Sequence, residues 1–377
     1  MIKYILSCVL FFIPVTILAD APDGELTSSA DPAVQVLINE LGLRESTIAS
    51  RDLEGWSPPK KIVVRSFRAD SLADLQMVAP GVEIVMVDSK EQAIEEAADA
   101  QAVVGFCNEE ILSGSPELFW VQMYTAGVER CVVLPDMNKG HKLLTNGQRI
   151  GSPALAEHAI AMMMVLARGL DLYHANQLKG QWQQEVGLSR TDHMELEGRT
   201  LLVVGLGGIG TQVAKRGHGL GMHVIATRNS RREGPDYVDY VGLSDELHEL
   251  ASRADVVINT VPLTDQTRGM FNAGFFDAMK SNAYFISVGR GGSTVTDDLV
   301  SALQSGAIAG AGLDVTDPEP LPEGHPLWTM PRVIISPHTA GRSDKGRDRL
   351  YLMVKENLRR YVAGEPMLSV VDIERGY

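Results

Sequence analysis

Short apolar runs alternate with helix-length amphipathic stretches along most of the chain. In the first half, this alternation predicts strands and intervening helices, with strands at 62–64, 82–87 and 102–106 and helices at 72–78 and 91–98. The second half predicts strands separated by helices at 200–204, 223–226, 255–260, 283–287, 307–313 and 333–336. Strands that alternate with helices indicate parallel βαβ units. We therefore expect an α/β fold: two Rossmann-like or flavodoxin-like domains with parallel sheets and an interdomain cleft.

The domain boundaries follow from the same pattern. Residues 20–60 are mixed in character and end in a Ser-Pro-Pro sequence, so we expect an N-terminal extension and linker with a short helix near residues 34–41. A substrate-binding domain is expected over residues 61–150 and 342–377, because the helical tail at 344–361 is expected to return to the first domain. The six-stranded series predicts a dinucleotide-binding domain over residues 151–341.

A long helix is predicted from Ala154 to Leu172, between the two series of strands. Ser152 is expected to cap it, with Pro153 in its first turn. Three consecutive methionines from Met162 face successive directions, which makes this helix apolar on nearly all sides. Such a helix is typical of a buried core or of a contact between subunits.

The first residues have the pattern of a secretory signal. Lys3 precedes an apolar run to Leu18, and Ala19-Asp20-Ala21 follows, so we expect residues 1–19 to be a signal peptide. The run is too short to span a bilayer, and no stable membrane span is expected after its removal. A signal peptide predicts a periplasmic or secreted protein. The alternatives are a buried first element or a misplaced start, with a cytoplasmic location.

Composition narrows the range of functions. The chain has 377 residues, of which 45% are hydrophobic, and a formal charge of −14, which argues against disorder and against nucleic-acid binding. Cys107 and Cys131 could pair in an oxidising compartment, but two cysteines in so long a chain do not make a disulfide framework, and we expect free thiols. Cys and His do not cluster as zinc ligands do, so no metal site is expected.

A glycine-rich turn follows the first strand of the second series and opens a helix, the context that gives a G-x-G-x-x-G motif its meaning. The motif consists of Gly205, Leu206, Gly207, Gly208, Ile209 and Gly210. Here Gly205 permits a tight turn, Gly207 lets the backbone approach a pyrophosphate, and Gly210 allows close packing of the helix. The amide groups and dipole at the helix N-terminus favour phosphate. We therefore expect a dinucleotide cofactor.

The end of the next strand indicates which dinucleotide binds. A carboxylate there would accept hydrogen bonds from the adenosine ribose, but the sequence has none; it reads Arg228, Asn229, Ser230, Arg231 and Arg232. Arg228 is best placed to meet a 2′-phosphate, with Arg231 or Arg232 in support. We expect NADP to be preferred, with NAD possible as a cofactor. The alternative is a solvated basic loop.

The later strands bring catalytic side chains to one edge, because ligands lie outside the carboxyl ends of parallel strands. These ends read Thr260-Val261-Pro262, Val288-Gly289-Arg290, Asp314 to Glu319, and Ser336-Pro337-His338. Reduction of a 2-oxo acid needs a cation for the carboxylate and a proton donor for the developing alkoxide. Arg290 suits the first task and His338 the second, and a carboxylate such as Glu319 beside the histidine would favour its charged form.

Several motifs together resemble the D-isomer-specific 2-hydroxyacid dehydrogenases over residues 62–377. These are the glycine motif and long helix, 261–269 (VPLTDQTRG), 288–292 (VGRGG), 312–315 (GLDV) with Glu319-Pro320, and 336–341 (SPHTAG). The resemblance implies that Arg290 binds substrate, that Glu319 is the partner of the acid/base His338, and that Asp314 lies near the nicotinamide amide. The loop 124–128 (YTAGV) matches the family's first-domain loop, which implies substrate-carboxylate binding at Ala126 and Gly127.

The resemblance also implies further cofactor contacts at Thr260, Val261, Pro262, Val288, Asp314 and Gly341, and a homodimer to which the helix from Ser152 contributes. Two departures stand out: Ser287 replaces an asparagine found in many members, and Arg228 replaces the aspartate that selects NAD. The second is similar to NADPH-preferring glyoxylate/hydroxypyruvate reductases. Alternatives are a dinucleotide-sensing protein of the corepressor type and a phosphite dehydrogenase. Glu319, where formate dehydrogenases have glutamine, argues against that branch.

Overall fold

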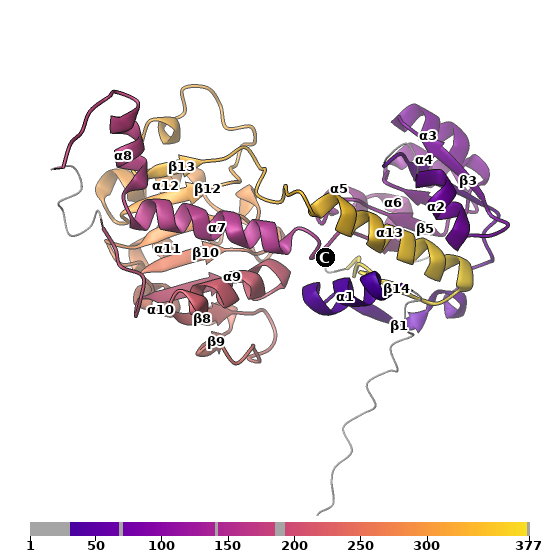
Figure 1. The fold of residues 1–377 in the computed structure, drawn as a ribbon, viewed down its shortest axis with the longest axis horizontal. Coiled ribbons are helices and arrows are strands. Elements are labelled where there is room, and N and C mark those ends of the chain that lie inside the picture. Colours follow the sequence, from indigo (N-terminus) through magenta and orange to yellow (C-terminus); the bar gives the residue numbers. More distant parts are fainter. Residues whose placement is uncertain (1–30, 68–70, 140–141, 185–192, 375–377) are drawn as a thin grey trace, which may run out of the picture.

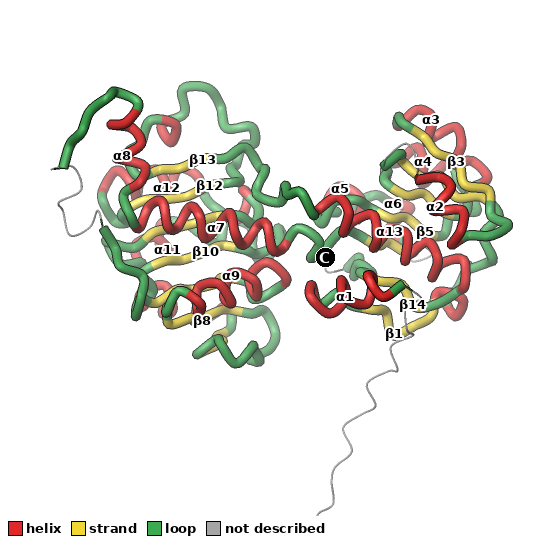
Figure 2. The backbone as a smooth tube through the Cα atoms, in the orientation of Figure 1, coloured by secondary structure: helices red, strands yellow, loops and turns green. Residues whose placement is uncertain are grey.

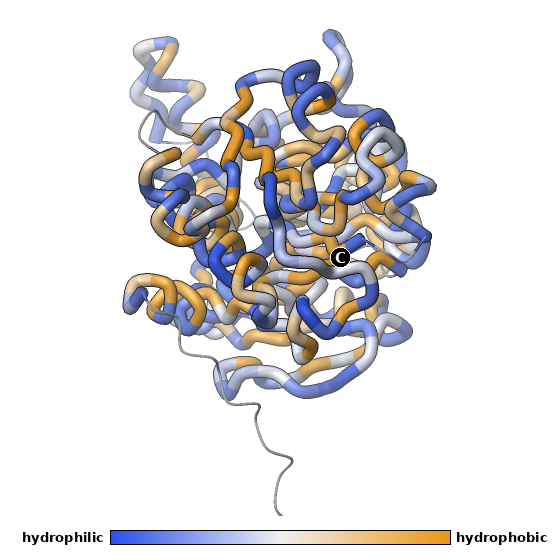
Figure 3. Tube along the Cα trace, turned by 90° about the vertical axis from the view of Figure 1, so that its right-hand side faces the viewer, coloured by the Kyte–Doolittle hydropathy of each residue, from blue (hydrophilic) through white to orange (hydrophobic). Residues whose placement is uncertain are grey.

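The computed structural model describes residues 31–67, 71–139, 142–184 and 193–374 of the chain. The expected signal peptide lies outside these residues. Figure 1 shows two α/β lobes joined by the segments that lead into α7 and α13, and Figure 2 shows a sheet with helices on both faces in each lobe. Apolar and polar segments alternate along the whole fold (Figure 3), as buried strands and half-exposed helices require. The α/β fold with parallel sheets is confirmed.

The first lobe is built on a parallel sheet in the order β3-β2-β4-β5-β6. Its strands are β2 (Lys61–Arg65), β3 (Glu83–Val87), β4 (Ala102–Val104), β5 (Trp120–Gln122) and β6 (Leu143–Thr145). Relative to chain order this is the flavodoxin-like arrangement. Successive side chains of β2 point to opposite faces, so Ile62 and Val64 enter one core and Val63 the other.

Helices cover both faces of this sheet. The face with Ile62 packs against α2 (Ser71–Val78) and α13 (Gly346–Ala363), so the helical tail returns to the first lobe as expected. The opposite face packs against α3 (Lys90–Glu96), α4 (Glu109–Gly114), α5 (Glu129–Val132) and α6 (Pro135–Asn138). Elsewhere in both lobes the chain forms short 3₁₀ helices, at Ser50–Asp52, Ala97–Asp99, Ser244–Glu246, Gly291–Ser293 and Pro326–Trp328.

The second lobe has a parallel sheet in the order β13-β12-β11-β10-β7-β8-β9, the doubly wound arrangement of dinucleotide domains. Its strands are β7 (Thr200–Val204), β8 (His223–Thr227), β9 (Tyr240–Gly242), β10 (Val256–Asn259), β11 (Tyr284–Ser287), β12 (Gly310–Leu313) and β13 (Val333–Ile335). The expectation of six strands was wrong by one. The missed strand, β9, is three residues long and begins at the exposed Tyr240, so it carries almost no apolar signal.

One face of this sheet packs against α7 (Ser152–Ala167) and α9 (Gly208–Gly219). The other packs against α10 (Leu247–Arg253), α11 (Ala273–Ala278) and α12 (Thr296–Ser305). The predicted helix from 154 to 172 is in fact two helices, because Gly169 adopts a left-handed conformation with φ of 62° before α8 (Leu170–Gln177). Ser152 is the first residue of α7 rather than its cap; Gly151 occupies the cap position.

The N-terminal segment is part of the first lobe rather than a simple extension and linker. The expected short helix is α1 (Pro32–Leu41), which packs against α13 through a small apolar core. After it, β1 (Glu45–Ala49) pairs antiparallel with β14 (Pro366–Leu368). The Glu45 carboxylate also lies 3.0 Å from the fully buried guanidinium of Arg360. These contacts hold residues 31–52 firmly against the C-terminal helix.

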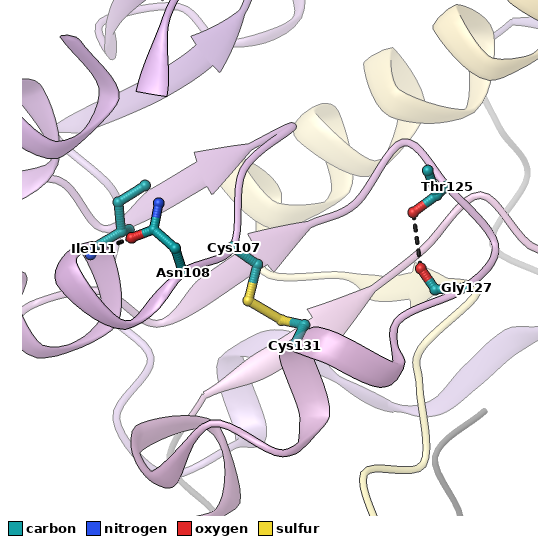
Figure 4. The surroundings of a disulfide bond; sticks show 6 residues. All are labelled: Cys107, Asn108, Ile111, Thr125, Gly127 and Cys131. Carbon is teal, nitrogen blue, oxygen red and sulfur yellow. Dashed lines mark hydrogen bonds between the residues drawn. A yellow bond between two sulfur atoms is a disulfide. The ribbon is translucent and has the colours of Figure 1, made fainter. Parts of the chain in front are cut away.

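Cys107 and Cys131 form a disulfide bond (Figure 4), so the expectation of two free thiols was wrong. Cys107 follows β4 and Cys131 lies in α5, which follows the neighbouring strand β5. The carboxyl ends of adjacent parallel strands meet at one edge of a sheet, and the two Cα atoms are consequently 5.8 Å apart. A separation of 24 residues in sequence hides this proximity.

Candidate active site

The expected catalytic side chains lie at one edge of the second sheet. Four neighbouring parallel strands, β10 to β13, end there, and each is followed by one of the predicted segments: Thr260–Pro262, Val288–Arg290, Asp314 and 336–338. This is the edge at which doubly wound sheets bind ligands.

No described helix combines the length and the apolar character that a membrane span requires.

His338 and Glu319 are in direct contact. The imidazole Nδ1 lies 2.6 Å from Glu319 Oε1, and both side chains are about half exposed. A carboxylate at Nδ1 fixes the orientation of the ring. Within the described part of the chain, no protein group bonds the other ring nitrogen, Nε2, which is therefore available to a substrate.

The backbone around His338 is held in an uncommon conformation. His338 has φ of 52°, in the left-handed region that few non-glycine residues adopt. Its N–H donates to the carbonyl oxygens of Asp314 and Ser336, at 2.9 and 3.1 Å. Such an outlier persists only where its surroundings over-determine it, and these two bonds supply that constraint.

Asp314 is buried and holds the same turn through its side chain. Oδ1 accepts from Ser336 Oγ at 2.6 Å and from the Thr339 N–H at 2.9 Å, while Oδ2 accepts from the Ala340 N–H at 3.0 Å. His158, on α7, bonds Ser336 Oγ at 2.8 Å. The geometry therefore gives Asp314 a part in positioning His338, in addition to the cofactor contact that the resemblance implies.

Arg290 reaches from the second lobe to the first. Its Nε donates to Glu129 Oε1 at 2.9 Å, and its Nη1 donates to the Gly289 carbonyl at 3.0 Å. A side chain on Gly127 would lie 2.3 Å from Arg290 Nη2, so this position accepts no side chain while Arg290 is there. Arg290 thus lies directly over the loop that the resemblance assigns to the substrate carboxylate.

Side chains that bond its backbone carbonyl groups shape that loop. Asn146 Nδ2 donates to the Ala126 carbonyl at 2.7 Å, and Thr125 Oγ1 donates to the Gly127 carbonyl at 2.8 Å. The N–H groups of Ala126 and Gly127 donate to no other group in the described residues. Two free backbone donors beside a guanidinium are suited to a carboxylate.

A buried amide supports the floor of the site. Asn259 Nδ2 donates to Ser287 Oγ at 3.0 Å and to Ser293 Oγ at 2.9 Å, and Asn259 Oδ1 accepts from the Val261 N–H at 3.0 Å. Val288 is buried beside it, and Thr267 donates to the Pro262 carbonyl at 2.6 Å. Ser287 stands where many members of the family have asparagine, and its hydroxyl has a defined hydrogen-bond partner in Asn259.

The glycine loop has the geometry of a phosphate site. Gly205 has φ of 95°, and a side chain on Gly210 would lie 2.2 Å from the Gly205 carbonyl oxygen, so each glycine is required by the turn or by packing. Thr260 Oγ1 donates to that same carbonyl at 2.6 Å. Gly207 is different, because no atom of the described residues lies within 4 Å of the place a side chain would occupy. Open space at this position suits the close approach of a ligand.

The remaining residues of the motif and of the basic loop are placed as follows. Leu206 is buried and Ile209 is partly buried in the core under α9, while Asn229, Arg231 and Gly341 are exposed. The Arg232 side chain already has partners within the protein, because it bonds Glu246 at 2.7 Å and the Tyr240 hydroxyl at 3.0 Å. Arg228 Nε is buried, and nothing in the described ranges of the chain forms a hydrogen bond with it. Of the two supporting arginines, Arg231 is therefore the one left for a ligand.

Glu129 and Asn259 are site residues that sequence reasoning missed. Glu129 follows the 124–128 loop directly, and that position was its one available signal. Asn259 ends a predicted strand as a polar residue within an apolar run, which also marks it. In the described part of the chain no three His, Cys, Asp or Glu side chains are grouped as metal ligands.

Comparison with known proteins gives a consistent result. Residues 160–340 match the model of the D-isomer specific 2-hydroxyacid dehydrogenase NAD binding domain. A glyoxylate reductase of Korarchaeum cryptofilum is 32% identical over 291 residues, which cover 76% of this chain and 87% of the relative.

Two crystal structures have the same fold. The NADPH-dependent glyoxylate/hydroxypyruvate reductase of Sinorhizobium meliloti, in complex with NADP and sulfate, has a TM-score of 0.71 at 28% identity and covers 84% of this chain and 100% of its own. A D-isomer specific 2-hydroxyacid dehydrogenase of Xanthobacter autotrophicus, in complex with NADPH and MES, has a TM-score of 0.71 at 26% identity, with coverages of 85% and 100%.

Proposed function

Because the chain belongs to the D-isomer specific 2-hydroxyacid dehydrogenases, which are NAD(P)-dependent oxidoreductases, we propose that it reduces a short 2-oxo acid with NADPH. The observation that carries this proposal is the contact of 2.6 Å between His338 and Glu319, at the sheet edge that also bears Arg290. The contact supplies a proton donor, and the arginine supplies a cation for an acid substrate.

Each residue has a separate task in this proposal. Arg290 and the free N–H groups of Ala126 and Gly127 bind the substrate carboxylate. His338 donates a proton from Nε2 to the carbonyl oxygen as negative charge develops there, while Glu319 stabilises the charged imidazole. NADPH, when bound, supplies the hydride to the 2-carbon.

The residues present fit a phosphorylated dinucleotide. The open space at Gly207 and the N-terminus of α9 would receive the pyrophosphate. Arg228 and Arg231 would receive a 2′-phosphate, since Arg228 Nε lacks a protein partner and no carboxylate ends β8. The Sinorhizobium meliloti reductase, which is NADPH-dependent, supports this preference.

We propose glyoxylate and hydroxypyruvate as the substrate class, since these are the substrates in the names of the reductases reported above. Absorbance at the reduced-nicotinamide band would follow oxidation of NADPH and NADH by the purified chain with glyoxylate, hydroxypyruvate, pyruvate and phenylpyruvate. We expect turnover with glyoxylate or hydroxypyruvate and a preference for NADPH. In Arg228→Asp the NADPH Michaelis constant should rise much more than the NADH one.

Other results would overturn separate parts of the proposal. If Arg228→Asp changes the Michaelis constants of NADPH and NADH equally, Arg228 does not contact the 2′-phosphate. Cofactor binding without turnover on any of the acids would favour a sensing protein, and phosphite-dependent cofactor reduction would identify a phosphite dehydrogenase.

A further inference from the structure

Four arginines from distant segments gather beside the glycine loop. Arg228 and Arg231 follow β8, Arg149 precedes α7, and Arg44 follows α1. A side chain on Gly208 would lie 2.8 Å from Arg149 Cγ, so the Arg149 side chain rests against the first residue of α9. Its Nη1 donates to the Leu41 carbonyl at 3.2 Å. Arg149 therefore lies between the glycine loop of the second lobe and the N-terminal helix of the first.

This cluster has no anionic partner among the described residues. None of the four guanidinium groups forms an ion pair with a carboxylate among the residues that the structure describes. Burial lowers the pKa of Arg149, and the charges of Arg44, Arg228 and Arg231 lower it further. Burial also lowers the pKa of Arg228, as do Arg231 and Arg44; Glu233 opposes this without pairing. Like charges held together this way favour a bound anion.

The backbone around the cluster is fixed in place. Arg149 has φ of 70°, a left-handed conformation that is uncommon outside glycine and marks a constrained position. On the other side, the Arg44 carbonyl accepts from the Ser369 N–H at 2.8 Å, and the next residue, Glu45, pairs with the buried Arg360. Both arginines are thus presented from rigid segments, which reduces the entropy lost when they bind a ligand.

We propose that Arg149 and Arg44 complete a site for the adenosine 2′-phosphate that Arg228 and Arg231 begin, so that the N-terminal segment and both lobes share the cofactor. This inference rests on the proposed use of NADPH. A phosphate monoester carries a charge of about −1.5 to −2 near neutral pH, and several arginines can bind its oxygens in bidentate fashion. The pyrophosphate would bind at a separate place, to the backbone at the N-terminus of α9.

Calorimetric titration of the purified full chain tests the inference without any reaction. NADPH, NADH, 2′,5′-ADP and 5′-AMP would be titrated into the wild type and into Arg149→Met and Arg44→Met. We expect Arg149→Met to weaken the binding of NADPH and of 2′,5′-ADP by about 10- to 100-fold, which is the usual effect of losing a hydrogen bond between charged groups. Arg44→Met, at an exposed position, should weaken them by a smaller factor of about three. NADH and 5′-AMP should change little.

Arg232→Met is the matched control. It removes an arginine from the same loop, but one that is already bound to Glu246, and should leave all four affinities unchanged. If Arg149→Met weakens the binding of NADPH and NADH equally, Arg149 contacts the pyrophosphate and the inference fails. The proposed function would still stand if the wild type prefers NADPH. A wild type without that preference would overturn the proposed function itself. Unchanged affinities in both Arg44→Met and Arg149→Met would overturn the inference alone, and Arg44→Met keeps this test valid should Arg149→Met not fold.

Discussion

Three contacts determine how His338 can act. Glu319 bonds one ring nitrogen, and the carbonyl groups of Asp314 and Ser336 accept from the backbone N–H. The ring is therefore oriented before a substrate arrives, which lowers the reorganisation needed in the transition state. Replacement of this side chain should remove the proton donor while leaving the binding groups around Arg290 in place.

For His338→Ala we expect turnover to fall by about 10²–10⁴, the usual contribution of one general acid, with cofactor affinity little changed. Steady-state kinetics and titration of NADPH would measure the two quantities. His248→Ala is the control, since it removes an exposed histidine on α10, away from the active edge. Unchanged turnover in His338→Ala would exclude this residue from proton transfer.

At the residue scale, the sequence was sufficient wherever a side chain follows a predicted strand. Arg290, Asp314 and His338 could be found because the carboxyl ends of parallel strands meet at one edge. The contact between Arg290 and Glu129 could not be found in this way, because it crosses between the lobes and depends on how they are placed. The arginine cluster around Arg149 was missed for the same reason.

Most elements with a strong apolar signal were predicted, but β5 and β6 of the first lobe were not. The strand predicted at 200–204 is β7, residue for residue, and most other boundaries differ by one to three residues. β9 was missed because a short strand at an exposed edge needs few apolar residues. The break between α7 and α8 was missed because Gly169 ends the helix within a sequence whose apolar pattern continues. At Gly169 a local backbone feature outweighs the periodic pattern.

The segment after this break presents apolar side chains that no other described part of the chain covers. Leu178 and Trp182, which follow α8, are 76% and 90% exposed, and α8 lies at the outer side of its lobe (Figure 1). Large exposed apolar groups on one projecting segment are typical of an interface. They agree with the expected homodimer, and we predict that they contribute to its contact surface.

In solution, the wild type should therefore be a dimer, and Leu178→Ser with Trp182→Ser should shift it toward the monomer. Light scattering coupled to size exclusion would measure the mass of each. Met77→Ser is the matched control, because it removes an exposed apolar side chain, 71% accessible, from α2 in the other lobe. A monomeric wild type, or a double variant that stays dimeric at the same concentrations, would contradict this prediction.

At the scale of the whole molecule, two independent features concern the compartment in which the protein folds. The N-terminal sequence has the pattern of a signal peptide, and Cys107 is bonded to Cys131. Disulfides persist in oxidising compartments such as the periplasm and are rare in the cytosol. The bond also fixes α5, whose first residue is Glu129, the partner of Arg290 across the lobes. We propose that the protein is exported, in which case this one bond connects its compartment with the geometry of the active site.

Export predicts a definite chemical form of the mature chain. Cleavage after Ala19 removes Cys8, so the chain recovered from outside the cytoplasm should begin at Asp20 and take up no alkylating reagent when denatured without a reductant. After reduction it should take up two equivalents, at Cys107 and Cys131. The same chain started at Asp20 and kept in the cytoplasm is the control, and it should react at both thiols before reduction. Intact mass would separate these forms. An uncleaved chain confined to the cytoplasm would contradict export, and reactive thiols in an exported chain would contradict the disulfide.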